Sequence, residues 1–316
     1  MAKERVLITG GAGYLGSVLT KRLLDHDYAV TCVDNLMYGQ KSPMLHVHDR
    51  NYAFVRGDVR DRDLMGGLVS RVDSVIPLAA IVGMPACKRI PREAKEINHD
   101  AVVMLNELRG SNQKMVFPNT NSGYGIGTGE KYCTEETPLN PISLYGITKC
   151  QAEAHLLRDE EKDAVTLRLA TVFGVSPRMR TDLLVNNFVL NAMREGNLVL
   201  YEKDFKRNFV HVQDVARGFE HCLEKFDGMK NKPHNLGLDD ANISKLELAK
   251  KIKQHIPGLI ILDAPLAEDP DKRDYVVSNE RIKRTGFVPL VSLDDGIAEL
   301  IRGFEILLAD NPYGNV

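Results

Sequence analysis

The stretch Val6-Leu7-Ile8-Thr9-Gly10-Gly11-Ala12-Gly13-Tyr14-Leu15-Gly16 joins an apolar run, a glycine-rich turn and the start of an amphipathic segment. Its spaced glycines allow a tight turn, a close approach of backbone to pyrophosphate, and close packing of the next helix on the strand. A helix that starts beyond Gly13 directs its first N–H groups and its positive dipole end at those phosphates. The stretch therefore predicts a dinucleotide site at Gly10, Gly13, Tyr14 and Leu15.

An acidic residue closes the second apolar run, Ala29–Val33. Asp34 stands where a carboxylate is expected to bond to the adenosine ribose hydroxyls, and Asn35 follows as a further cofactor contact. Because a carboxylate repels a 2′-phosphate, the sequence favours NAD over NADP. Asp58 and Val59 follow a third strand, and we expect this pair to meet the adenine.

Short β-branched runs alternate with segments of helical periodicity through the first half of the chain. This alternation predicts an α/β fold with a Rossmann-type doubly wound parallel sheet. Strands are predicted at Arg5–Thr9, Ala29–Val33, Ser74–Leu78, Lys114–Phe117 and Val165–Leu169, and helices at Tyr14–Asp25, Arg62–Arg71, Pro91–Leu108 and Tyr145–Arg158.

The regular alternation of predicted strands and helices ends after Gly174. A helix is predicted at Thr181–Arg194, strands at Leu198–Tyr201 and Phe209–Val212, and a last helix at Ser292–Leu308. We expect an NAD-binding Rossmann domain at residues 1–174 and a smaller mixed α/β substrate lobe at residues 175–316, with later strands able to return to the first sheet.

Composition and charge exclude several classes of function. The formal net charge is −2 and the Lys and Arg residues are scattered, so no basic surface for nucleic acid or an acidic membrane is expected. The five cysteines have no CxxC spacing, which favours free thiols and no metal site. No apolar run is long enough for a membrane helix or a signal peptide. We therefore expect a cytoplasmic protein that does not bind membranes.

A phenol and an ammonium lie four residues apart in Tyr145-Gly146-Ile147-Thr148-Lys149, which puts them on one face of a helix. Oxidation of a carbinol requires a base for the hydroxyl proton, and a neighbouring cation favours the phenolate that can act as that base. Thr120 ends the strand upstream, at the edge where such sheets bind ligands. We expect Thr120 to hold the reacting oxygen beside Tyr145.

Together these residues resemble the extended short-chain dehydrogenase/reductases that act on nucleotide-diphosphate sugars. The likeness covers nearly the whole chain and includes Thr9–Gly16, Asp58-Val59, the run Leu78-Ala79-Ala80, Asn98 and the Tyr145–Lys149 pair. It implies that Thr120, Tyr145 and Lys149 are catalytic, that Leu78, Ala79 and Ala80 contact tightly bound NAD, and that Asn98 is structural.

The second half carries the substrate residues of this resemblance. It implies that Arg207 and Arg273 bind the substrate pyrophosphate, and that Asn187 and Tyr201 line the nucleotide and its base. An arginine suits this task because its planar fork matches phosphate oxygens. Relatives of this kind are commonly homodimers joined by a four-helix bundle, which would lie near Ala94–Arg109 and Gly146–Arg158 here.

Some positions depart from the family pattern. Pro77 and Thr171 replace a frequent histidine and asparagine, and Asn121-Ser122 stands where 4,6-dehydratases carry Asp-Glu. That acidic pair expels water in the dehydratases, so we do not expect a 4,6-dehydratase.

Three stretches, Pro118–Gly127, Leu169–Gly174 and Ser176–Arg180, resemble the GDP-heptose 4-dehydrogenases of bacterial capsule synthesis. This resemblance implies oxidation at C4, release of the ketone, and 2-oxoglutarate as the acceptor that restores NAD. It also makes Arg178, Arg180 and the loop Cys87-Lys88-Arg89 candidates for anion contacts near the sugar. The same catalytic residues suit a 4-epimerase of UDP- or GDP-sugars. A non-catalytic NAD-binding redox sensor is the third alternative.

Overall fold

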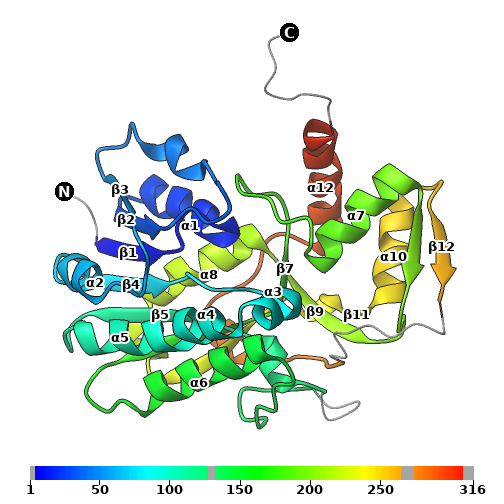
Figure 1. The fold of residues 1–316 in the computed structure, drawn as a ribbon. Helices are drawn as coiled ribbons and strands as arrows, with labels where there is room; N and C mark the ends of the chain where they lie inside the picture. Colours follow the sequence, from blue (N-terminus) through cyan, green and yellow to red (C-terminus); the bar gives the residue numbers. More distant parts are fainter. Residues whose placement is uncertain (1–3, 127–131, 265–273, 309–316) are drawn as a thin grey trace.

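A seven-stranded parallel sheet lies at the centre of the fold (Figure 1). The computed structural model describes residues 4–126, 132–264 and 274–308. The strands follow in the spatial order β3 (Tyr52–Arg56), β2 (Ala29–Asp34), β1 (Arg5–Thr9), β4 (Ser74–Pro77), β5 (Lys114–Thr120), β6 (Ala164–Leu169) and β10 (Lys232–Leu236). The chain reverses its direction across the sheet between β1 and β4, and such a switch point opens a crevice for ligands. The predicted doubly wound parallel sheet is confirmed.

Helices cover both faces of this sheet because successive side chains of each strand point to opposite sides. In β1, Val6 and Ile8 pack with α1 (Tyr14–Asp25) and α8 (Val212–Glu224), while Leu7 packs on the other face. That other face is covered by α2 (Arg62–Val69), α5 (Ala101–Leu108) and α6 (Leu144–Arg158). Both faces of the central strands are therefore buried, which is why β4 and β6 show no alternation of buried and exposed residues, whereas the edge strand β3 is partly exposed.

Two smaller sheets form the rest of the molecule. One joins β7 (Thr171–Phe173), β9 (Lys206–His211) and β11 (Asn242–Ser244), and the other pairs β8 (Asn197–Leu200) with β12 (Ile260–Asp263). They share a core with α7 (Leu184–Glu195), α10 (Lys245–His255) and α12 (Leu293–Leu307). Strand β10 returns to the large sheet from well beyond residue 174, so the domain boundary at that residue stays a prediction.

Short elements complete the described chain. They are η1 (Ser42–His46), α3 (Met84–Arg89), η3 (Asn121–Tyr124), α9 (Phe226–Met229), η4 (Asp239–Ala241) and α11 (Glu280–Arg284). In the part of the chain that the structure describes, no helix combines the length and the hydropathy needed to cross a bilayer.

The single helix predicted over residues 91–108 is interrupted. The structure has α4 (Pro91–Lys95), a π-helical turn η2 (Glu96–Asp100) and then α5. The turn presents Asn98, whose amide donates to the carbonyl of Ile81 at 2.9 Å and accepts from its N–H at 2.8 Å. An inserted residue of this kind re-aims a side chain without ending the helix. Asn98 thus fixes the segment that follows β4.

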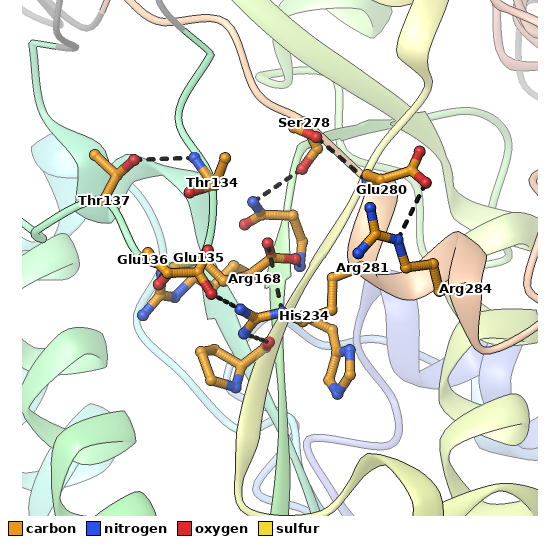
Figure 2. A network of polar contacts seen from close by, with 12 residues as sticks. Thr134, Glu135, Glu136, Thr137, Arg168, His234, Ser278, Glu280, Arg281 and Arg284 are labelled. Atoms are coloured by element: carbon orange, nitrogen blue, oxygen red, sulfur yellow. Dashed lines mark hydrogen bonds and ion pairs between the residues drawn. The ribbon is translucent and has the colours of Figure 1, made fainter.

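A polar network at the far edge of the sheet links Arg168 of β6, Glu135 and Arg281 of α11 (Figure 2), and an ion pair with Glu153 extends it to α6. Arg168 of β6 pairs with Glu153 of α6 at 2.7 Å and donates to the backbone carbonyl of Glu135 at 3.1 Å. The Glu135 carboxylate accepts from the N–H of Asn235 in β10 at 2.8 Å and lies 3.8 Å from Arg281 of α11. The network therefore holds α6, which carries the Tyr145 and Lys149 pair, against two strands.

Candidate active site

One cavity of about 810 Å³ lies along the carboxyl ends of the strands of the large sheet. It collects residues that are far apart in the sequence and that follow β1, β2, β3, β4 and β5. The predicted site residues that line it are Gly10, Gly13, Tyr14, Leu15, Asp34, Asn35, Asp58, Val59, Leu78, Ala79, Ala80, Arg89, Thr120, Tyr145, Lys149, Arg178, Arg180, Asn187 and Arg207.

The glycine-rich turn forms one wall of this cavity. Gly10 has a φ of 71°, and a Cβ there would lie 2.6 Å from the backbone nitrogen of Ala79. A Cβ on Gly16 would overlap the carbonyl oxygen of Gly10. Only glycine lets the turn contact β4 and α1 this closely. The N-terminus of α1 then faces the cavity through Tyr14 and Leu15, the arrangement that binds a pyrophosphate.

Asp34 ends β2 and is buried at the rim of the turn. Its carboxylate accepts hydrogen bonds from the N–H of Ala12 at 3.1 Å and of Leu36 at 2.8 Å. Burial raises the pKa of Asp34, and these two N–H groups oppose that rise. The carboxylate therefore also braces the turn, besides its predicted contact with ribose hydroxyls.

Asp58 lies further along the same wall. Its carboxylate pairs with Arg60 at 2.7 Å, and Arg60 also pairs with Glu96 at 2.7 Å. The hydrogen bond from Arg60 is the main reason that the pKa of Asp58 is lowered. The group is thus an acceptor at this wall, as the predicted contact with an adenine amino group requires.

The opposite wall carries the first two turns of α6. Ser143 caps the helix by accepting from the N–H of Gly146 at 3.1 Å. Tyr145 lies in the first turn and Lys149 one turn later, and both side chains reach the cavity. Lys149 is only 3% exposed, and its Nζ lies 4.0 Å from the centroid of the Phe117 ring. Burial lowers the pKa of Lys149 to about 7.

Thr120 ends β5 beside this helix. Its hydroxyl donates to the Oγ of Ser122 at 2.9 Å and accepts from the N–H of Ser122 at 3.1 Å. Ser122 also lines the cavity, a place that the sequence pattern did not predict for it. The spacing of two residues after Thr120, inside the turn η3, is the signal that would have found it.

The two arginines of the segment after β7 lie at different ends of the cavity. Arg180 forms an ion pair with Asp182 and acts electrostatically on the phenol of Tyr145. Burial, the largest effect, lowers the pKa of Arg180, but the hydrogen bond and charge of Asp182, together with Tyr145 and Tyr14, raise it overall. Arg178 was expected near the sugar, yet its guanidinium stacks on the ring of Tyr38 close to Asp34. The sequence suggested the same role for both arginines because they are only two residues apart, and their different surroundings are visible only in the structure.

The predicted substrate residues Arg207 and Asn187 line the cavity. Arg207 is 3% exposed, donates to the carbonyl of Lys206 at 3.2 Å and lies 6.0 Å from the ring of Tyr275. Asn187 lines the cavity from α7 and donates to the carbonyl of Thr181 at 3.2 Å. Arg273 lies outside the described residues.

The structure does not bring Tyr201 into the cavity, so its predicted place beside the base stays a prediction. Its side chain is 42% exposed and is not among the residues that line the cavity. The buried positions of β8 are Leu198 and Leu200, so the alternate positions point outward. Lys245 and Tyr275 line the cavity instead, and no spacing in the sequence pointed to them.

Comparison with known proteins covers almost the whole chain. A model of the NAD dependent epimerase/dehydratase family matches residues 6–237. UDP-glucuronic acid decarboxylase 2 of Arabidopsis thaliana is 31% identical, over 95% of this chain and 68% of its own. UDP-glucuronic acid decarboxylase 1 of Xenopus tropicalis is 27% identical, over 98% and 75%.

Solved structures agree in fold. UDP-glucose 4-epimerase of Thermotoga maritima, with UDP-glucose, has a TM-score of 0.83 and 26% identity over 96% of this chain and 100% of that chain. UDP-glucuronic acid 4-epimerase of Bacillus cereus, with UDP-glucuronic acid and NAD, has a TM-score of 0.84 and 24% identity over 96% and 99%. The chain is similar to each of these along nearly its full length.

Proposed function

The chain belongs to the NAD-dependent epimerase/dehydratase family, and from this premise we propose that it oxidises C4 of a nucleotide-diphosphate sugar. It is an NAD-dependent enzyme of the extended short-chain dehydrogenase/reductase type. The observation that carries the proposal is the single cavity that contains the glycine-rich turn together with Thr120, Tyr145 and Lys149. The turn and the N-terminus of α1 fit a pyrophosphate, and Asp34 fits a ribose, so the residues present suit NAD.

The reactions named for the relatives share one requirement. A 4-epimerase must make the C4 carbon planar before a hydrogen returns to its other face. Decarboxylation of a uronic acid becomes easy once C4 is a ketone, because the carboxylate is then in the β-keto position. An intermediate with a C4 ketone is therefore common to the reactions of the epimerases and decarboxylases that this chain resembles.

Three side chains divide the work of this oxidation. Thr120 holds the reacting oxygen, and Tyr145 takes its proton as general base. Lys149 is one helical turn away in a buried position, where a cation favours the phenolate form of a tyrosine. When bound, NAD supplies the hydride acceptor. Of the three side chains, Lys149 is buried, while Thr120 and Tyr145 are half-buried at the cavity.

The finer proposal is that the enzyme releases a 4-keto sugar from GDP-heptose and that 2-oxoglutarate or a similar 2-oxo acid restores NAD. Its support is the resemblance of Pro118–Gly127, Leu169–Gly174 and Ser176–Arg180. The second candidate is a 4-epimerase, supported by the likeness to the UDP-glucose 4-epimerase of Thermotoga maritima. Both use the same base, so the fate of the ketone decides between them.

A product survey tests this proposal. The pure protein is mixed with GDP-heptose and UDP-sugars, with and without 2-oxoglutarate, and products are followed by NMR. A 4-keto sugar that accumulates over many turnovers only with 2-oxoglutarate supports the dehydrogenase, and a C4 epimer without any acceptor supports the epimerase. No turnover of any nucleotide sugar, with NAD bound, contradicts the proposal and favours the redox sensor.

A pair of variants tests the assigned base. Tyr145→Phe should lower turnover at least ~10²-fold, because it removes the group that takes the proton. Tyr132→Phe removes the hydroxyl of an exposed tyrosine and serves as the matched control. Equal turnover in the two variants would remove Tyr145 from the mechanism.

Two assignments about the whole molecule also stay predictions. We propose a homodimer formed through the helices near Ala94–Arg109 and Gly146–Arg158, which sedimentation velocity tests by the mass in solution. We propose a cytoplasmic location, which cell fractionation tests.

A further inference from the structure

The segment between β7 and α7, residues 174–183, lines the cavity through Arg178, Arg180, Asp182 and Leu183; we call it the strap. The phenol of Tyr14 donates to the carbonyl of Gly174 at 2.7 Å, and the hydroxyl of Ser176 donates to the carbonyl of Tyr14 at 2.7 Å. Near the other end, Asn186 of α7 donates to a strap carbonyl at 2.8 Å. The strap is therefore attached to the first turn of α1, where the dinucleotide phosphates are expected.

The strap places Arg178 against the opposite rim. The Cζ of Arg178 lies 4.7 Å from the centroid of the Tyr38 ring, and both residues line the cavity. Tyr38 belongs to the loop after β2, so this stack joins segments from the two halves of the chain. A guanidinium over an aromatic face at this distance is an attractive cation–π contact.

The stack lies at the Asp34 end of the cavity. The N–H of Tyr38 donates to Gln40 at 3.0 Å, and the amide of Gln40 donates to Asp34 at 3.3 Å. The charge of Arg178 also acts on Asp34, where it opposes the larger effect of burial on the pKa of that carboxyl. Arg178, Tyr38 and Asp34 therefore surround the place where the adenosine ribose is expected.

We propose that Arg178 and Tyr38 bind the adenosine half of NAD and retain it between turnovers. Arg178 adds positive charge beside Asp34, and the stack lies at an exposed edge of the cavity, where we infer that the adenosine enters and leaves. Dissociation then requires the stack to open, so losing either partner should speed release. The proposal rests on the NAD dependence of the family and not on the identity of the sugar, so it stands or fails separately from the proposed reaction.

The test measures release of NADH. Protein loaded with NADH is mixed with a large excess of NAD, and the loss of bound-NADH fluorescence gives the dissociation rate. The variants are Tyr38→Ala, Arg178→Ala, the double variant and Tyr38→Phe, which keeps the ring. Arg50→Ala removes an exposed arginine outside the cavity and is the matched charge control. Because Tyr38 is 53% exposed, its truncation should leave the fold intact, which circular dichroism checks.

We expect Tyr38→Ala and Arg178→Ala each to raise the dissociation rate about threefold to thirtyfold. The dissociation rate of the double variant should rise by less than the product of the increases in the two single variants, because both substitutions remove the same contact. Tyr38→Phe and Arg50→Ala should resemble the wild type. Dissociation within about twofold of the wild type in both single variants would overturn the proposal, and so would fully independent effects or equal rates in Tyr38→Phe and Tyr38→Ala.

Discussion

The buried Lys149 should lower the free energy of unfolding of the NAD-free protein. Lys149 is 3% exposed, and burial lowers its pKa from 10.5 to about 7. A lysine whose pKa falls on folding binds fewer protons in the folded state, so its destabilising effect is complete below pH ~7 and disappears as the pH rises toward 10.5. These pKa values correspond to a cost of about 4 kcal/mol at pH 7 and about 2 kcal/mol at pH 9. Lys149→Met, which keeps an unbranched apolar chain, should remove that cost and also lose turnover.

Urea denaturation of the NAD-free wild type and Lys149→Met at pH 7 and pH 9 measures this effect. Far-ultraviolet circular dichroism is a suitable probe because the chain has no tryptophan. The variant should be the more stable protein at pH 7, and its advantage should shrink by about 2 kcal/mol at pH 9. Lys253→Met, at an exposed position of α10, controls for the loss of one charge and should show no such change. An advantage that is the same at both pH values, or a variant less stable than the wild type at pH 7, would refute this explanation.

Further expected outcomes concern the cofactor site and the buried network. The wild type should bind NAD at least about tenfold more tightly than NADP, and Asp34→Asn should narrow that ratio in fluorescence titrations because it removes the charge that repels a 2′-phosphate. An unchanged ratio of NAD to NADP affinity would show that Asp34 does not determine the cofactor preference. Gly10→Ala should lose NAD binding and about 1–3 kcal/mol of stability in urea, since its Cβ would meet Ala79 at a positive φ; a variant that binds NAD normally would contradict this. Glu153→Gln should cost about 3–5 kcal/mol because Arg168 then stays buried without its partner. A loss below ~1 kcal/mol would mean that the pair is not isolated from water.

Much of the fold could be predicted because its signals are local. The strand Arg5–Thr9 and the helix Tyr14–Asp25 have the predicted bounds, since a β-branched run, a glycine turn and an amphipathic period follow each other without a gap. The π turn at Glu96–Asp100 could not be predicted in the same way. Its inserted residue is stabilised by the contact of Asn98 with Ile81, which exists only once β4 and α5 pack together.

The site was predictable where the fold itself gathers residues. Parallel strands end at one edge of the sheet, so Asp34, Asp58 and Thr120 could be assigned to a common cavity from their places at the ends of predicted strands. Residues from the second half depend on how the lobes pack, and Lys245 and Arg178 reached places that no spacing predicted.

Hydride transfer from C4 to the dinucleotide is the step on which the proposed function depends, and isotope labelling follows it directly. The wild type, loaded with NAD, is mixed in a single turnover with a nucleotide sugar deuterated only at C4, and the cofactor is examined by mass spectrometry. We predict one deuterium in the NADH formed, and none when the label is at C5 or when Tyr145→Phe replaces the wild type. NADH without deuterium from the C4-labelled sugar would contradict oxidation at C4.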